Sequence, residues 1–157
     1  MSKTYMAQKL FDEGAAAYLK EDYKTSLKLF TQALKHDRKS ALVYSSRGTA
    51  YLKLNKFKKA ISDFSRAIRL NPKYASAYHL RGLAYEKMND FAPAFRDFNQ
   101  ALEIDPDLSA AYRSRDSVLD KTIDDQLQME DAEIADHLAA MRVARFNGDK
   151  ILYDSEI

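Results

Sequence analysis

The chain of 157 residues contains no cysteine, which excludes disulfides, thiolate metal sites and cysteine nucleophiles. Glycine (four residues) and proline (three residues) are scarce, so a turn-rich all-β fold is not expected. No apolar run approaches the roughly 18–20 residues of a membrane helix. The first nine residues also lack the apolar stretch of a secretory signal. We therefore expect a helical, cytoplasmic protein with no membrane partner.

The composition is that of a folded domain, with 46% hydrophobic and 31% charged residues. The net charge of +2 hides a strong asymmetry along the chain. Residues 1–74 carry 16 Lys+Arg and 6 Asp+Glu, a net charge of +10, whereas residues 75–157 carry 9 and 17, a net charge of −8. The chain is therefore an electric dipole along its own length.

One repeat period, the step from Gly14 to Gly48 and again to Gly82, runs through the sequence. Seven columns show it: Gly14, Gly48 and Gly82; Phe30, Phe64 and Phe98; Ala33, Ala67 and Ala101; Ser26, Ala60 and Ala94; Tyr23, Phe57 and Phe91; Tyr44, Tyr78 and Tyr112; and Pro72 and Pro106. This agreement predicts a chain built from repeated structural units.

Each unit has the pattern of two amphipathic helices. In residues 41–74, Tyr44, Gly48 and Tyr51 fall at helical steps, and Ala60, Phe64 and Ala67 form a second stripe after a short break. We expect an antiparallel hairpin in which the glycine faces Ala60 and allows a close helix approach. The phenylalanine is expected to fill the wedge between neighbouring hairpins, and the proline to follow the end of the second helix.

These columns resemble the tetratricopeptide repeat, which has a large residue, Gly, Tyr, Ala, Phe, Ala and Pro at fixed offsets within each unit. Units 41–74 and 75–108 match every signature column, whereas unit 7–40 has Leu10, Ala17 and Arg38 in place of three of them. The expected organisation is listed in chain order: repeats 7–40, 41–74 and 75–108, a capping helix 109–121, an acidic amphipathic helix 122–146 and a flexible tail 147–157. Asp116 in place of the glycine argues against a fourth hairpin, since it would be buried without a partner.

The resemblance implies an all-α, antiparallel helix-hairpin solenoid that curls into a right-handed superhelix. Its concave groove would be lined by the first helix of each unit. The groove residues expected to bind a peptide are Phe11, Ala15, Tyr18, Leu42, Ser45, Ser46, Thr49, Leu52, His79, Leu80, Leu83 and Arg113. An apolar streak crosses this surface and consists of Phe11, Tyr18, Leu42, Leu52, Leu80 and Leu83. Either a partner or the chain's own terminal segments would cover it. Replacing Phe11 and Leu83 by aspartate is expected to abolish binding and to leave helicity intact.

Within the family, domains that hold the acidic tails of the large heat-shock chaperones use a clamp of Lys, Asn, Asn, Lys and Arg. The corresponding positions here are Phe11, Ala15, Ser46, Ser76 and Leu80. None of them matches the clamp, so a partner with such a tail is not expected. The short chain and the apolar groove are closer in outline to the secretion chaperones that hold translocator proteins, although the helices that precede the repeats in that group are missing.

No catalytic, metal or cofactor site is expected. The histidines, His36, His79 and His137, lie in different units without carboxylates at ligand spacing, although His79 on the groove could titrate near neutral pH. The carboxylate pairs lie in strongly hydrated stretches rather than in an apolar pocket, and no Gly-rich phosphate loop occurs. The one basic cluster, Lys53, Lys56, Lys58 and Lys59, lacks an aromatic platform, so no nucleic acid partner is expected.

The segment 122–146 leaves the period but has an apolar stripe and an acidic face. Residues 116–136 contain eight carboxylates and one lysine. This segment could cap the third repeat, pair with another copy, or dock on the basic half of a neighbour. Whether residues 109–146 form one helix or two stays open.

The function expected from the sequence is a non-catalytic adaptor or chaperone-like module that binds a protein or peptide. The alternative is a self-assembling scaffold, a homo-oligomer formed through residues 122–146.

Overall fold

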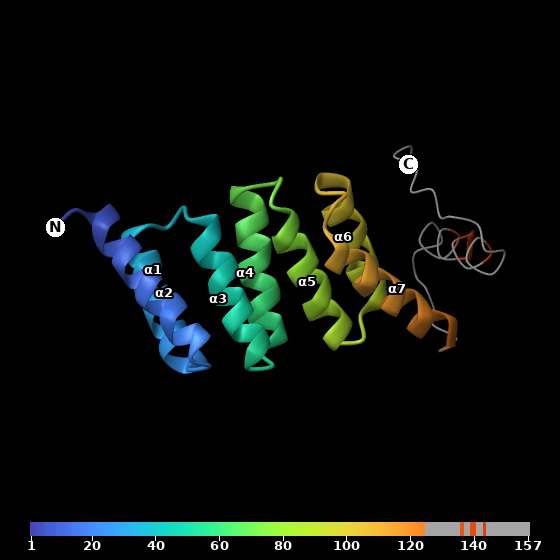
Figure 1. Ribbon diagram of the computed structural model, residues 1–157, viewed down its shortest axis with the longest axis horizontal. Helices are drawn as coiled ribbons and strands as arrows, with labels where there is room; N and C mark the ends of the chain where they lie inside the picture. Colours follow the sequence, from blue (N-terminus) through green and yellow to red (C-terminus); the bar gives the residue numbers. More distant parts are fainter. Residues whose placement is uncertain (125–135, 137–138, 141–142, 144–157) are drawn as a thin grey trace.

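The fold is a row of helix hairpins. The computed structural model describes residues 1–124, 136, 139–140 and 143, with the side chains of residues 123 and 124 excepted. Seven helices occupy residues 1–124, and that range contains no strand. They are α1 (Lys3–Leu19), α2 (Tyr23–His36), α3 (Ala41–Lys53), α4 (Phe57–Leu70), α5 (Ala75–Lys87), α6 (Phe91–Ile104) and α7 (Ser109–Asp124). Figure 1 shows them following one another along the long axis of the molecule. The expected all-α helix-hairpin solenoid is thereby confirmed.

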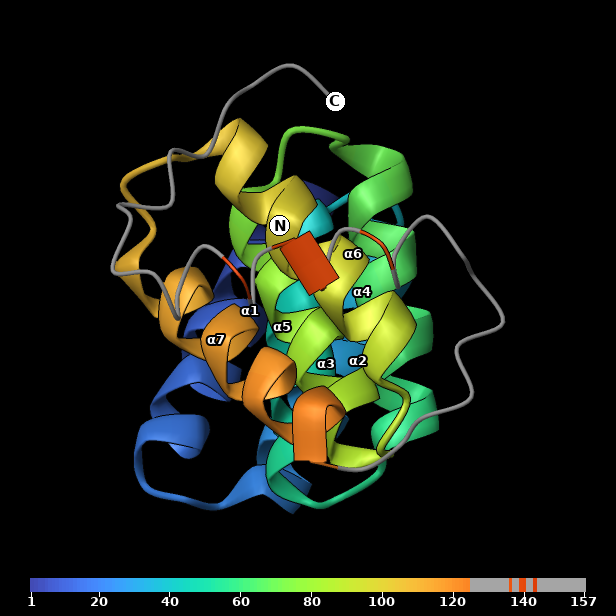
Figure 2. The same ribbon diagram turned by 90° about the vertical axis from the view of Figure 1, so that its right-hand side faces the viewer.

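Each helix contacts the next one along the chain, so α1 with α2, α3 with α4 and α5 with α6 form three hairpins. Helix α7 packs against α6 and also touches α5. Figure 2 looks onto the α7 end of the stack and shows α7 beside α5. Seven helices therefore fit three hairpins followed by one further helix.

The turn inside each hairpin repeats the same backbone conformation. Glu21, Asn55 and Asn89 lie one repeat period apart and have φ values of 61°, 56° and 57°. At the first of these turns the amide of Asp22 donates to the carbonyl of Ala17 at 3.0 Å, which closes the end of α1. Asparagine tolerates this left-handed conformation better than most residues, because its short polar side chain makes local hydrogen bonds.

Helix α7 continues where the other first helices end. Position 123, in register with Asn55 and Asn89, is Ile, a β-branched residue that disfavours positive φ. The helix accordingly runs to Asp124, beyond the expected limit at 121. The expected acidic helix over 122–146 and the tail over 147–157 lie largely outside the described residues.

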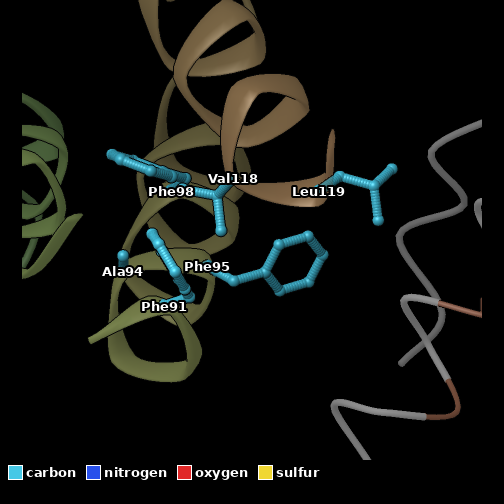
Figure 3. Packing of buried hydrophobic residues seen from close by; sticks show 6 residues of the cluster. All are labelled: Phe91, Ala94, Phe95, Phe98, Val118 and Leu119. Atoms are coloured by element: carbon cyan, nitrogen blue, oxygen red, sulfur yellow. The ribbon is translucent and has the colours of Figure 1, made fainter. Parts of the chain in front are cut away.

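The core alternates between layers of small and aromatic side chains. Phe64 is fully buried between Ala60 of its own hairpin and Ala84 of the next one, as expected for a wedge between hairpins. Figure 3 shows the last cluster, in which Phe91, Ala94, Phe95 and Phe98 of α6 pack with Val118 and Leu119 of α7. Burial of these side chains holds α7 onto the third hairpin.

The repeated glycines lie against phenylalanine rings of the second helix in their own hairpins. A Cβ on Gly48 would lie 2.8 Å from Cε1 of Phe64, and a Cβ on Gly82 would lie 2.5 Å from Cε1 of Phe98. The glycine therefore allows the second helix to pack closely against the first, and the nearest atoms at this contact belong to the phenylalanine ring.

Candidate functional site

The candidate site is the face formed by the first helix of each hairpin together with α7. Contacts join α1 to α3, α3 to α5 and α5 to α7, so these four helices lie in one row. Figure 1 shows them side by side along the molecule. We call this surface the first-helix face. All twelve residues that were assigned from the sequence to a peptide-binding groove lie on these four helices.

These twelve residues differ in how much surface they expose. Leu42 is 51% exposed, and Arg113 is also exposed. Ser45 is only 4% exposed, so it has almost no surface for a ligand. The remaining nine are half-buried: Phe11, Ala15, Tyr18, Ser46, Thr49, Leu52, His79, Leu80 and Leu83. Ser45 therefore belongs to the interior of the hairpin stack, although helical spacing assigned it to the same surface as Leu42.

The apolar streak also contributes to the packing of the hairpins. Leu52 and Leu80 pack against the buried cluster that contains Phe64. Leu83 packs against the cluster around Phe98, and the ring of Phe11 lies 5.7 Å from that of Phe30. Each of these side chains therefore has one side in the core, so an aspartate at Phe11 or Leu83 would also disturb the fold. Leu42 belongs to none of the core clusters of the described residues and is the better probe of this face.

His79 links two helices of the first-helix face. Its Nε2 lies 3.0 Å from Oγ of Ser114, whose hydroxyl donates to the carbonyl of Ala110 at 3.0 Å. These contacts connect the His79 ring, the Ser114 hydroxyl and the backbone of α7 in one hydrogen-bonded chain. Burial lowers the pKa of His79, and the nearby Glu86 opposes this shift less strongly. The imidazole is therefore neutral at physiological pH and serves as a packing and hydrogen-bonding group.

A charged pair lies further along the same helices. Nζ of Lys121 donates to Oε1 of Glu86 at 2.5 Å, and Oγ of Ser117 donates to the same oxygen at 3.4 Å. These contacts tie α7 to α5 across the first-helix face. The side chains of Glu86, Ser117 and Lys121 are therefore hydrogen-bonded to one another at the α7 end of this face.

A ladder of buried ion pairs was not anticipated from the sequence. Nε and Nη2 of Arg47 donate to both carboxylate oxygens of Asp63 at 2.8 Å, and Arg81 does the same with Asp97 at 2.7 Å. Asp63 and Asp97 are each 5% exposed, and each carboxylate is bound by an arginine and not paired with a second carboxylate. Hydrogen bonding to Asp97 raises the pKa of Arg81, so its guanidinium stays charged.

The ladder also joins neighbouring hairpins. Nη1 of Arg47 donates to Thr31, and Nη1 of Arg81 donates to Ser65, in each case 16 residues back. Arg115, which is 3% exposed, donates from Nη1 to Oδ1 of Asn99 at the same spacing. The arginines recur at positions 47, 81 and 115 and the aspartates at positions 63 and 97, each one repeat period apart, so this column pattern could have revealed the ladder.

Two structural features are absent from the described part of the chain: a cluster of metal-ligating side chains and a helix that could span a membrane. This part contains no group of three or more His, Asp or Glu side chains that could hold a metal ion. Within that part, no helix has the length and apolar character needed to cross a bilayer.

Comparison with known families identifies the repeat. The family model described as "TPR repeat" matches residues 48–89, and the model "Tetratricopeptide repeat" matches residues 75–108. A heat shock protein sti1 homolog of Schizosaccharomyces pombe is 44% identical over 46 residues. That match spans 29% of this chain but only 8% of the length of the yeast protein.

Solved structures share the fold over most of the chain. The first TPR domain of the human RPAP3 protein has a TM-score of 0.76 and 25% identity, and the match covers 80% of this chain and 99% of that domain. The first TPR of Spaghetti (RPAP3), solved bound to the HSP90 peptide SRMEEVD, has a TM-score of 0.75 and 25% identity. That match covers 76% of this chain and 95% of the other.

Proposed function

The chain belongs to the tetratricopeptide-repeat family, and from that membership we propose that its first-helix face binds a segment of a partner protein. The chain would act as a non-catalytic adaptor or chaperone-like module. The observation that carries this proposal is Leu42, a large apolar side chain that is 51% exposed at the start of α3, beside the half-buried Ser46 and Thr49. An apolar surface rimmed by polar groups is typical of protein interaction sites, and the half-buried Phe11, Leu80 and Leu83 add to the apolar surface of this face.

The chemistry of the face favours a partner segment with apolar side chains over an acidic tail. At the five positions of the heat-shock clamp, this chain has Phe11, Ala15, Ser46, Ser76 and Leu80. None of these side chains carries a positive charge, so no cationic donor is available here for a carboxylate. We therefore propose an apolar segment, in contrast to the acidic peptide SRMEEVD bound by the Spaghetti domain.

A peptide selection tests this proposal. A random peptide library displayed on phage is selected against the full chain, and the enriched peptides are measured against Leu42→Asp. We expect enrichment of peptides with large apolar side chains and a loss of at least about tenfold in affinity for Leu42→Asp, because a carboxylate would replace an apolar contact. Ser62→Asp, which introduces the same carboxylate at an exposed position of α4 outside the first-helix face, is the control and should bind as the wild type does.

The HSP90 peptide SRMEEVD is the second probe. We expect no saturable binding of this peptide at concentrations at which the selected peptides bind. Equal binding of the selected peptides by the wild type and by Leu42→Asp would contradict the placement of the site. Tight binding of SRMEEVD would contradict the proposed partner chemistry.

A further inference from the structure

Helices α2 and α4 present a surface of one charge sign. Seven basic side chains on them are exposed: Lys24, Lys28, Lys35, Lys58, Lys59, Arg66 and Arg69. We call this surface the basic face. Helix α2 contains no Asp or Glu, and the one acidic residue of α4, Asp63, is 5% exposed and bound to Arg47. The basic face therefore carries no exposed carboxylate of its own helices.

The basic face ends at the boundary between the second and third hairpins. Lys24 and Lys58 occupy one position of the repeat period, and the third hairpin has Ala92 there. At a second such position, Lys35 and Arg69 are followed by Glu103. The positive charge is therefore a property of two adjacent hairpins and not of the repeat in general.

The carboxylates that flank α2, Asp22 and Asp37, accept hydrogen bonds from backbone amides and keep their negative charge. Asp22 accepts from the amide of Thr25 and Asp37 from the amide of Lys39. Hydrogen bonding to Thr25, and to a smaller extent the charge of Lys24, lowers the pKa of Asp22.

The ion pairs shown within residues 1–124 join Arg47 to Asp63, Arg81 to Asp97 and Lys121 to Glu86. None of these pairs uses a side chain of the basic face. Lys59 and Arg66 lie over the rings of Tyr51 and Tyr44, which leaves their positive charge in place. The face therefore keeps a net positive charge that can attract an outside anion.

An apolar hollow lies at one edge of the basic face. It measures about 450 Å³ and lies between the start of α4 and the end of α5, with Phe57 and Met88 among its lining residues. Lys56, Lys58 and Lys59 also line it, and Met88 is 39% exposed. This combination suits a segment that carries several carboxylates together with a large apolar side chain.

The sequence contains such a segment beyond α7. Residues 125–136 have five carboxylates and no Lys or Arg, and they also contain Leu127, Met129 and Ile134. They follow α7, which Figure 1 places at the opposite end of the hairpin row from α2. Twelve residues span at most about 40 Å when fully extended, and on the same chain they would have to pass the third hairpin before reaching the basic face.

We propose that two copies of this chain pair antiparallel, so that the basic face of each one binds residues 125–136 of the other. The two ends of the chain carry opposite charge, so a two-fold arrangement brings both pairs of complementary surfaces together at once. The leucine, methionine or isoleucine of the segment would enter the hollow beside Met88. This inference concerns helices α2 and α4 and does not rest on the function proposed for the first-helix face.

Sedimentation equilibrium of the full chain tests the dimer. At low ionic strength we expect the mass to rise with concentration toward about twice 18.0 kDa. At about 1 M salt the Debye length falls to about 3 Å, and the mass should return to that of one chain. The variant Lys58→Glu/Lys59→Glu should raise the dimer dissociation constant at least about tenfold, since attraction becomes repulsion on both contacts. Lys3→Glu/Lys9→Glu on α1 makes the same change in net charge at exposed positions and should dimerise as the wild type does.

A mixing experiment identifies the partner segment. Asp131→Lys/Glu133→Lys should also fail to dimerise alone, whereas a mixture of this variant with Lys58→Glu/Lys59→Glu should form dimers. In the mixed dimer, the variant basic face of one chain meets the variant segment of the other, so the charges of both partners are reversed and still attract. The second contact has the wild-type residues on both sides. Three results would overturn the proposal: a wild-type mass of one chain at every concentration, a dimer that is indifferent to the change at Lys58 and Lys59, or no rescue on mixing. A one-chain mass together with a salt-dependent sedimentation coefficient would show instead that the segment folds onto its own chain.

Discussion

Arg81 holds Asp97 by two parallel hydrogen bonds of 2.7 Å, and the same guanidinium donates to Ser65 in the preceding hairpin at 3.1 Å. One side chain thereby joins the two helices of its own hairpin and links that hairpin to its neighbour. Arg47 makes the equivalent set of contacts one repeat earlier. The relative positions of the hairpins, and with them the shape of the first-helix face, depend on these arginines as well as on apolar packing.

Asp97→Ala should lower the free energy of unfolding by about 3 kcal/mol, because it leaves a largely buried guanidinium without its counter-ion. Urea denaturation followed by circular dichroism measures this loss. Glu103→Ala, which removes an exposed carboxylate from the same helix, should change stability by less than about 0.5 kcal/mol. The double variant Arg81→Leu/Asp97→Leu should lose less free energy of unfolding than the sum of the losses in Arg81→Leu and in Asp97→Leu. Additive losses would contradict a coupled pair.

Glu21→Asn should raise the free energy of unfolding by about 0.5–1 kcal/mol, because position 21 has φ = 61° and asparagine tolerates this conformation better than glutamate. The reciprocal change Asn55→Glu, at a position with φ = 56°, should lower it by a similar amount. Thermal and urea unfolding of both variants measure the effect. A loss of stability in Glu21→Asn would mean that the glutamate side chain contributes more than the backbone strain removes.

Gly48→Ala should lower stability by about 1–2 kcal/mol, although alanine favours a helix more than glycine does, because the new Cβ would lie 2.8 Å from the ring of Phe64. The matched control introduces the same change in a Phe64→Leu background, where the smaller side chain gives way. There Gly48→Ala should be neutral or stabilising relative to Phe64→Leu alone. A loss of equal size in both backgrounds would rule out the ring as the cause.

The stability of the protein should fall as the pH drops from about 7 to about 5, in part because of His79. Burial lowers the pKa of His79 below its ordinary value of 6.5, so the unfolded chain takes up this proton before the folded chain does. The contribution of His79 is thus lost as the pH falls through about 6.5 toward the lower folded pKa. Urea midpoints across this range should drop less in His79→Gln than in the wild type. His36→Gln, an exposed histidine of α2, is the control and should follow the wild type.

The repeat could be predicted from the sequence, but the candidate site could be predicted only in part. The repeat period located the hairpins because helix-forming stripes and helix ends are local properties. Helical spacing alone assigned Ser45 and Leu42 to one surface with no distinction between them. In the structure Ser45 is 4% exposed and Leu42 is 51% exposed, and this difference arises from the packing of the helices and not from helical spacing.

The sequence by itself determined the helical class, the number of hairpins and the separation of charge between the two halves of the chain, because each follows from the order and spacing of residues. Only the tertiary structure decided that Gly48 makes room for Phe64, that Arg81 binds Asp97, and that the lysines of α2 and α4 lie exposed without carboxylates. These relationships join residues on different helices. They depend on the angle and distance at which the helices pack, and a one-dimensional pattern does not contain that information.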